Sequence, residues 1–170
     1  MSHLNVEIKA RTTDLDKIRE LLKSNNPDFI GVDHQVDTYF RVSAGRLKLR
    51  EGNIENHLIY YERENTSGPK KSNVILYKNN PGSELKEILI KSLGVLAVVD
   101  KRREIYFINN VKFHLDKVSG LGTFIEIEAI DKDGAIGYEK LLEQCNYYLK
   151  ILHVSIEDLI ETSYSDLLLI

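Results

Sequence analysis

Residues 46–50 are Arg46-Leu47-Lys48-Leu49-Arg50, a strict alternation of basic and apolar side chains. Successive residues of a β-strand point to opposite faces of a sheet, so this stretch predicts a strand with one basic face and one apolar face. A face in contact with water usually mixes both signs of charge, because adjacent like charges repel one another. The run therefore favours a strand whose basic face meets groups of opposite charge.

Three other stretches, residues 6–11, 112–116 and 124–129, alternate in the same way and supply those groups. For any one of them, the ordinary alternative is an antiparallel sheet whose charged side lies in water. Together they suggest a sheet that closes with its charged faces inward and its apolar faces outward. The polar residues of these three faces are Glu7, Lys9 and Arg11; His114 and Asp116; Glu126 and Glu128.

The whole chain predicts an α+β fold, an eight-stranded antiparallel closed β-barrel (a tunnel) with a charged interior, covered outside by helices. Eight strands suffice for a closed barrel that holds side chains or one small ligand. The chain has no internal repeat or linker, so residues 1–170 form one domain. Strands are expected near residues 4–11, 36–42, 46–51, 57–63, 73–78, 97–107, 111–117 and 123–130. Two amphipathic helices are expected over residues 83–93 and 136–149. Two more are expected to begin at capping boxes at Thr13 and Ser155, and the second of these carries Leu159, Ile160 and Leu167.

Composition narrows the class of protein. The 170 residues carry a formal net charge of −3, which argues against binding to nucleic acid through bulk positive charge. The single cysteine, Cys145, cannot form an internal disulfide and lies on the apolar stripe of a helix, so we expect it in the core. No signal peptide or membrane span is evident, so we expect a cytoplasmic protein with no membrane partner.

Lysines, arginines and glutamates that converge on one cavity indicate a particular ligand. Several Lys and Arg side chains match the charges of a polyphosphate, and Arg can bind phosphate in a bidentate manner. Carboxylates would repel that ligand unless a hard divalent cation, Mg²⁺ or Mn²⁺, lay between them. The pattern therefore predicts a cavity for a metal-bound triphosphate.

Several motifs, in this order along the chain, resemble the CYTH domain proteins, also called triphosphate tunnel metalloenzymes. This group includes class IV adenylyl cyclases, thiamine triphosphatases, inorganic triphosphatases and RNA triphosphatases, and the present chain is most similar to the cyclase-like branch. The resemblance covers nearly the whole chain. The motifs are Glu7-Ile8-Lys9-Ala10-Arg11, Gly45-Arg46-Leu47-Lys48-Leu49-Arg50-Glu51, Lys101-Arg102-Arg103, Phe124-Ile125-Glu126-Ile127-Glu128 and the closing Ser163-Tyr164-Ser165-Asp166-Leu167-Leu168.

The resemblance implies a tunnel open at both ends and a role for each charged residue in it. The implied metal ligands are Glu7, Glu126 and Glu128, with Asp116 as a further acceptor. The implied substrate-binding residues are Lys9, Lys48, Arg50, Arg63, Lys101 and Arg103, of which Lys9, Arg63 and Lys101 are also assigned to catalysis. The implied substrate is ATP, thiamine triphosphate or inorganic triphosphate, and a homodimer is possible in such a protein.

The first strand departs from the family pattern. Relatives usually show Glu-x-Glu-x-Lys, whereas this chain has Asn5-Val6-Glu7-Ile8-Lys9, so a second metal should bind more weakly. The reaction stays open between cyclisation and hydrolysis, and a nucleotide- or polyphosphate-binding protein without catalysis is the alternative. Of the remaining candidates, His114 is expected to be an orienting or structural group rather than a catalytic base, and His34, His57 and His153 are expected on the surface or in the core. Lys70 and Lys71 are expected in a solvated loop, with contact to the substrate at a tunnel mouth as the alternative, and Lys78 is left open between the tunnel lining and a strand end.

Overall fold

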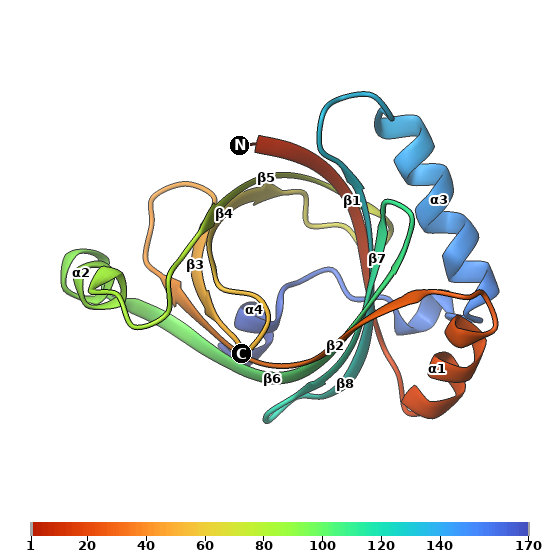
Figure 1. Ribbon diagram of the computed structural model, residues 1–170, viewed down its shortest axis with the longest axis horizontal. Helices are drawn as coiled ribbons and strands as arrows, with labels where there is room; N and C mark the ends of the chain where they lie inside the picture. Colours follow the sequence, from red (N-terminus) through yellow and green to blue (C-terminus); the bar gives the residue numbers. More distant parts are fainter. Residues whose placement is uncertain (1, 170) are drawn as a thin grey trace.

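The computed structural model describes residues 2–169 and shows a closed barrel of eight antiparallel strands (Figure 1). The strands follow the order β1-β5-β4-β3-β2-β6-β7-β8, and β1 closes the ring by pairing with β5 and β8. The predicted fold class is therefore confirmed. The strands are β1 (Ser2–Arg11), β2 (Asp28–Phe40), β3 (Arg46–Glu51), β4 (His57–Arg63), β5 (Lys70–Lys78), β6 (Val95–Ile108), β7 (Val111–Val118) and β8 (Gly122–Asp131).

Strand β2 is longer than predicted, because it begins at Asp28 rather than at residue 36. Its second half, from Val36, lies between β3 and β6, whereas its first half pairs along its length with β6 alone. Phe29 and Ile30 in this first half are about half exposed, at 56% and 49%. A segment that is open to solvent in this way need not alternate polar and apolar residues, so its sequence carries a weak strand signal.

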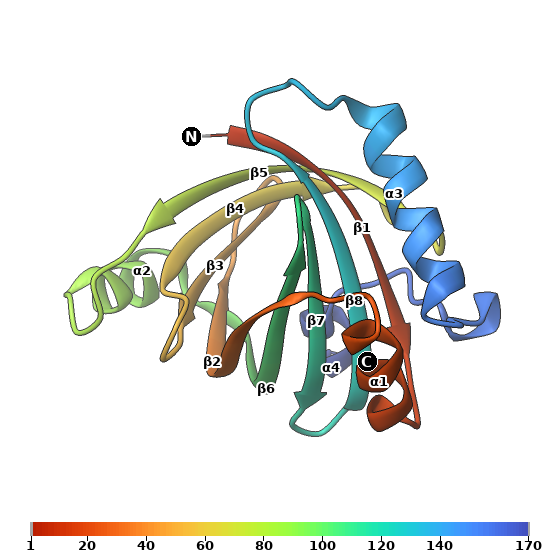
Figure 2. The same ribbon diagram turned by 45° about the vertical axis from the view of Figure 1, so that its right-hand side comes forward.

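Two helices cover the outer face of β1 and its neighbours (Figures 1 and 2). They are α1 (Leu15–Lys23) and α3 (Tyr138–Ile151), and each presents an apolar stripe to the barrel. The outward residues Val6 and Ile8 of β1 pack in one cluster with Leu22 of α1 and with Leu141 and Cys145 of α3, all nearly or fully buried. Burial of apolar side chains on the outside of the wall leaves its inside for charged ones.

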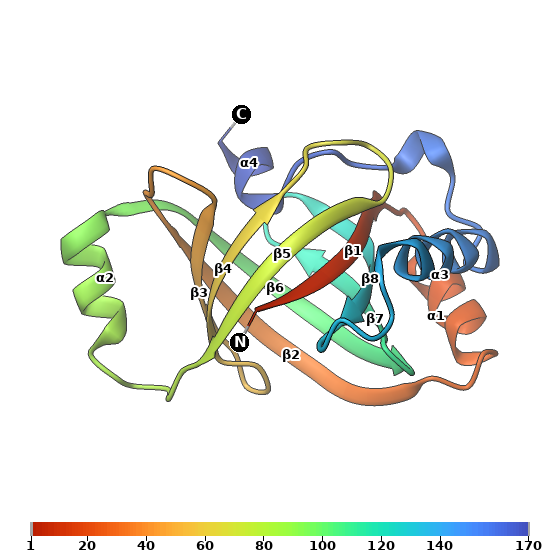
Figure 3. The same ribbon diagram turned by 90° about the horizontal axis from the view of Figure 1, so that it is seen from above.

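The helix between β5 and β6, α2 (Leu85–Leu93), lies beside the barrel and contains no buried residue (Figure 3). Among residues 2–169, no helix combines the length and apolar character that a bilayer-spanning helix requires.

The end of the chain differs from the prediction of one helix that begins at Ser155. A single 3₁₀ turn, η1 (Ile156–Asp158), is followed by extended backbone and then by the short helix α4 (Tyr164–Leu168). The backbone leaves the helical path because Leu159 bridges to Ala10 of β1 and the Ile160 N–H donates to the Lys9 carbonyl at 2.9 Å.

The predicted caps are displaced as well. The Ser155 side chain makes no capping hydrogen bond, and the capping box belongs to Ser163, which begins α4. At the first helix the cap is Asp14 rather than Thr13, since the Asp14 side chain accepts the Lys17 N–H. Helix α4 lies at one end of the barrel (Figures 1 and 3). Its first residue, Tyr164, lines the interior cavity.

Candidate functional site

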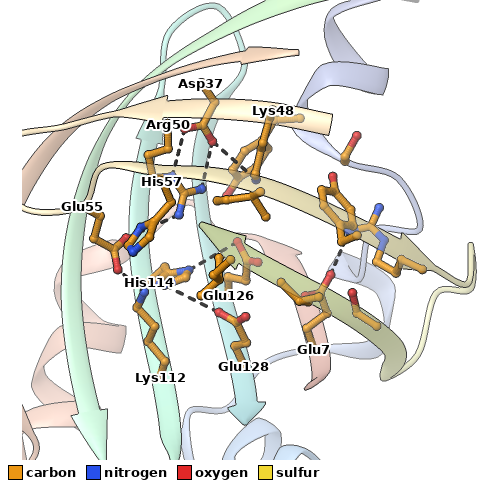
Figure 4. A pocket seen from close by; sticks show the side chains of 18 of the residues that line it. Glu7, Asp37, Lys48, Arg50, Glu55, His57, Lys112, His114, Glu126 and Glu128 are labelled. Carbon is orange, nitrogen blue, oxygen red and sulfur yellow. Dashed lines mark hydrogen bonds and ion pairs between the residues drawn. The ribbon is translucent and has the colours of Figure 1, made fainter. Parts of the chain in front are cut away.

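The interior of the barrel is a polar cavity of about 120 Å³, and its lining comes from every strand (Figure 4). The alternation of the strands turns their charged faces inward, as the sequence predicts. The charged residues that line the cavity are Glu7, Lys9, Asp37, Lys48, Arg50, Glu55, Arg63, Lys101, Arg103, Lys112, Glu126 and Glu128. Opposite charges thus share one desolvated space, which strengthens every interaction between them.

Asp37 of β2 holds three of the predicted phosphate-binding cations together. It accepts two hydrogen bonds from the Arg50 guanidinium, both at 2.9 Å, and one from Lys101 at 2.7 Å. Lys48 Nζ lies 3.5 Å from the same carboxylate. Burial alone would raise the pKa of Asp37, but Arg50 and Lys101 outweigh burial and hold the pKa well below its usual range. Asp37 is therefore ionised, and it fixes the positions of these cations.

Arg103 is fixed in a similar way by Asp116, which the resemblance had assigned to the metal. The two side chains form a bidentate pair with both distances at 2.7 Å, and Tyr164 of α4 donates to Asp116 Oδ2 at 2.7 Å. Both oxygens of this fully buried carboxylate are thus in use. Asp116 is also within 4.8 Å of possible ligand atoms on His114 and Glu126, yet its hydrogen bonds favour a role in holding Arg103.

The acidic wall consists of Glu7, Glu126 and Glu128 on the paired strands β1 and β8. Glu7 stands opposite Glu128 in the register, and Lys9 stands opposite Glu126, with Lys9 Nζ 3.8 Å from the Glu126 carboxylate. The Asn5 amide also points into the barrel and donates to Glu128. Position 5 therefore faces the acidic wall, where the family motif usually has a glutamate.

Glu128 carries the clearest electrostatic signal of this wall. Burial raises the pKa of its carboxyl to about 7, because Lys112 offsets only part of the desolvation and Glu7 and Glu126 add repulsion. The pKa of Glu126 lies well below its usual range, since Lys9 and Arg103 outweigh the effect of burial. Carboxylates crowded on one wall repel one another, and a hard divalent cation would relieve that repulsion. Among the described residues, the group whose possible ligand atoms lie within 4.8 Å of one another is His114, Asp116 and Glu126, so Glu126 is the member of this wall that belongs to it.

His114 and Arg63 leave buried polar atoms without a hydrogen-bond partner at this wall. Neither ring nitrogen of His114 has one, and its Nδ1 lies 3.6 Å from Glu126. Burial and Arg103 lower the pKa of His114 to about 3, so its ring is neutral at pH 7. Arg63 uses Nη1 for Glu7 at 3.0 Å but leaves Nε and Nη2 unpaired. Buried unpaired atoms of this kind are costly, and a bound ion or anion would satisfy them.

Several cavity residues were missed or misjudged from the sequence. Asp37 lies in the strand expected at residues 36–42, and Lys112 shares the inward face of His114, so the alternation of these strands was a usable signal. Glu55 had none, because it belongs to the loop between β3 and β4. Lys70 is 1% exposed and donates to the Ile160 carbonyl at 2.6 Å, so the expectation of a solvated loop was wrong for it. His57, expected on the surface or in the core, lines the cavity, whereas Lys71, Lys78, His34 and His153 are exposed.

Comparison with known proteins agrees with this architecture. Residues 3–164 match the family model of the CYTH domain, and the chain therefore belongs to the CYTH domain family. A Methanocaldococcus jannaschii protein named "putative adenylate cyclase" is 30% identical over 173 residues, which cover 96% of this chain and 98% of the relative.

Two solved structures share the fold. The PH1012 protein of Pyrococcus horikoshii has a TM-score of 0.80 at 25% identity, over 96% of this chain and 98% of its own. A Hippeastrum protein, described as a "putative adenylyl cyclase" with a dominant triphosphatase activity, has a TM-score of 0.59 at 13% identity, over 98% and 94% of the two chains.

Proposed function

We propose that this protein is a divalent-cation-dependent enzyme that binds a triphosphate along its barrel and cleaves a phosphoanhydride bond. The observation that carries the proposal is the division of one buried cavity into a cationic wall around Asp37 and an acidic wall of Glu7, Glu126 and Glu128. The cationic wall would bind the polyphosphate, and the acidic wall would bind a divalent cation that bridges the polyphosphate to the protein.

The cationic residues bind and orient the phosphate chain in this proposal. Lys48, Arg50, Lys101 and Arg103 are already oriented by Asp37 and Asp116, so little reorganisation is needed when phosphate oxygens arrive. Arg63 offers its two unpaired nitrogens at the side of Glu7. These groups stabilise the negative charge that develops on the phosphate that leaves.

Glu7, Glu126 and Glu128 would hold Mg²⁺ or Mn²⁺, with neutral His114 beside them. The ion would polarise the phosphorus under attack and neutralise phosphate oxygens. Lys9 lies between this wall and α4, with Nζ 3.8 Å from Glu126 and 3.7 Å from the centre of the Tyr164 ring. From there Lys9 would contact the phosphate nearest α4, and Lys101 the middle of the chain.

The nucleophile decides between two outcomes of the same cleavage. Water gives hydrolysis, and the ribose 3′-hydroxyl of ATP gives cyclic AMP with pyrophosphate as leaving group. The name of the Methanocaldococcus jannaschii relative favours the second outcome, and the description of the Hippeastrum structure favours the first.

A substrate panel tests the proposal. ATP, thiamine triphosphate and inorganic triphosphate are each incubated with the protein in EDTA, Mg²⁺ or Mn²⁺, and phosphate, pyrophosphate and cyclic AMP are measured. We expect metal-dependent turnover of at least one substrate, lost in the double variant Glu126→Gln/Glu128→Gln while its fold persists. Binding without turnover would favour the non-catalytic alternative, to which Asn5 adds support, and turnover that survives in the double variant would remove the metal assignment.

A further inference from the structure

At the mouth of the barrel opposite α4, the Glu55 carboxylate occupies a set of converging hydrogen-bond donors. The Glu55 carboxylate accepts hydrogen bonds from Gln35 Nε2 at 2.9 Å, from Arg50 Nη1 at 3.4 Å and from Lys112 Nζ. One neutral and two cationic donors that converge in a buried site are the surroundings that a phosphate group requires.

Strand β3 places this subsite at the end of the predicted phosphate track. Its first residue, Arg46, bonds to Asp166 of α4 at 2.8 Å, and its inward residue Arg50 contacts Glu55. Inward side chains on one strand recur about every 6.6 Å, so Arg46, Lys48 and Arg50 span about 13 Å. The cationic track is therefore bounded by α4 at one end and by Glu55 at the other.

The backbone under Glu55 is fixed by a second buried carboxylate. Asp33, fully buried on β2, accepts the backbone N–H groups of Asn53, Ile54 and Glu55 at 2.6, 2.9 and 2.9 Å. A Cβ atom at Gly52 would lie 2.7 Å from the Asp33 oxygens, so only glycine fits there. A loop held this firmly returns the Glu55 side chain to the same place.

We infer that Glu55 is a specificity residue that limits the length of the phosphate chain. The inference rests on the proposed function: a triphosphate binds with one end phosphate at Arg50, and a fourth phosphate beyond that end would have to take the position of Glu55. An additional phosphate meets a fixed negative charge there and finds Arg50 and Lys112 already neutralised. The Glu55 carboxylate thus excludes longer polyphosphates, because it occupies the position and the hydrogen-bond donors that their next phosphate would need.

Calorimetric titration with tripolyphosphate and tetrapolyphosphate tests this inference, with Ca²⁺ in place of Mg²⁺ and with phosphate release assayed in parallel, so that binding rather than cleavage is measured. We expect the wild-type protein to bind tripolyphosphate about tenfold more tightly than tetrapolyphosphate. A tenfold difference in affinity is about what one charge-assisted hydrogen bond contributes to binding. In Glu55→Gln the preference should disappear, because the fourth phosphate can then contact Arg50 and Lys112. The matched control is Glu62→Gln, the same change on an exposed residue of the adjacent strand β4, and it should keep the wild-type ratio.

Glu55→Asp provides a second route if the neutral variant does not fold. This variant keeps the negative charge, but its side chain is one methylene shorter. The preference for tripolyphosphate over tetrapolyphosphate should therefore weaken without vanishing. An unchanged ratio in both variants, or a gain that is equal for the two polyphosphates, overturns the inference and leaves the proposed function intact. A wild-type protein that binds neither polyphosphate overturns both.

Discussion

Replacing Glu128 by glutamine should stabilise the metal-free protein at alkaline pH. The pKa of Glu128 is raised from 4.5 to about 7, mainly by burial. The folded state therefore binds this proton more tightly than the unfolded state does. The stability associated with Glu128 is fully present below about pH 4.5 and is lost as the pH rises through 7. Glutamine stays neutral and can still accept the hydrogen bond from Asn5.

Raising the pKa of Glu128 from 4.5 to about 7 corresponds to about 3 kcal/mol. The linkage relation gives a cost of about 1 kcal/mol at pH 5 and about 3 kcal/mol at pH 8. The second figure is an upper bound, because 18% of the Glu128 side chain is exposed. Glu128→Gln should therefore gain up to about 2 kcal/mol in unfolding free energy over wild type between these two pH values.

Urea unfolding of both proteins at pH 5 and pH 8 in EDTA measures this difference. The neighbouring variant Glu126→Gln is the control of opposite sign, since Lys9 and Arg103 keep the pKa of Glu126 low despite its burial. That carboxylate stabilises the fold above its unfolded pKa, so its loss should cost stability at pH 8. A difference between Glu128→Gln and wild type that does not change with pH would refute the electrostatic account of the acidic wall.

Three further predictions follow from the walls of the cavity. Lys48→Ala should weaken triphosphate binding by about 1.5–3 kcal/mol and monophosphate binding by much less, and equal losses in calorimetry would show that Lys48 does not bind the phosphate chain. Asn5→Glu should lower the Mn²⁺ concentration needed for half-maximal activity and weaken triphosphate binding in EDTA, because it adds charge beside Glu128; superimposed metal titrations would place Asn5 outside the metal site. Arg103→Met should cost about 3–5 kcal/mol in chemical unfolding, since it leaves Asp116 buried and unpaired, and a cost below 1 kcal/mol would contradict that pairing.

Much of the barrel could be predicted from alternation alone. In residues 46–50 and 125–128, inward charged residues alternate with outward apolar residues, and a barrel with helices outside is a packing that buries both faces. The same alternation gave Glu126, Glu128, Lys48 and Arg50 as cavity residues before any contact was known. Periodicity succeeds here because a strand has only two faces.

Features fixed by contacts between distant segments could not be predicted in this way. Glu55 enters the cavity from a loop, and its position depends on Asp33, which is 22 residues earlier in the chain. The helix expected after Ser155 is interrupted because the backbone near Leu159 pairs with β1. Such tertiary hydrogen bonds override local helical preference, and no spacing in the sequence reveals them.

The most direct test of the account is a crystal structure of the protein with tripolyphosphate and Mn²⁺, using the anomalous scattering of manganese to locate the ion. The account predicts one strong manganese peak bounded by Glu7, Glu126 and Glu128, and a phosphate chain against Lys48, Arg50, Lys101 and Arg103. Manganese away from these carboxylates, or tripolyphosphate outside the barrel, would contradict it.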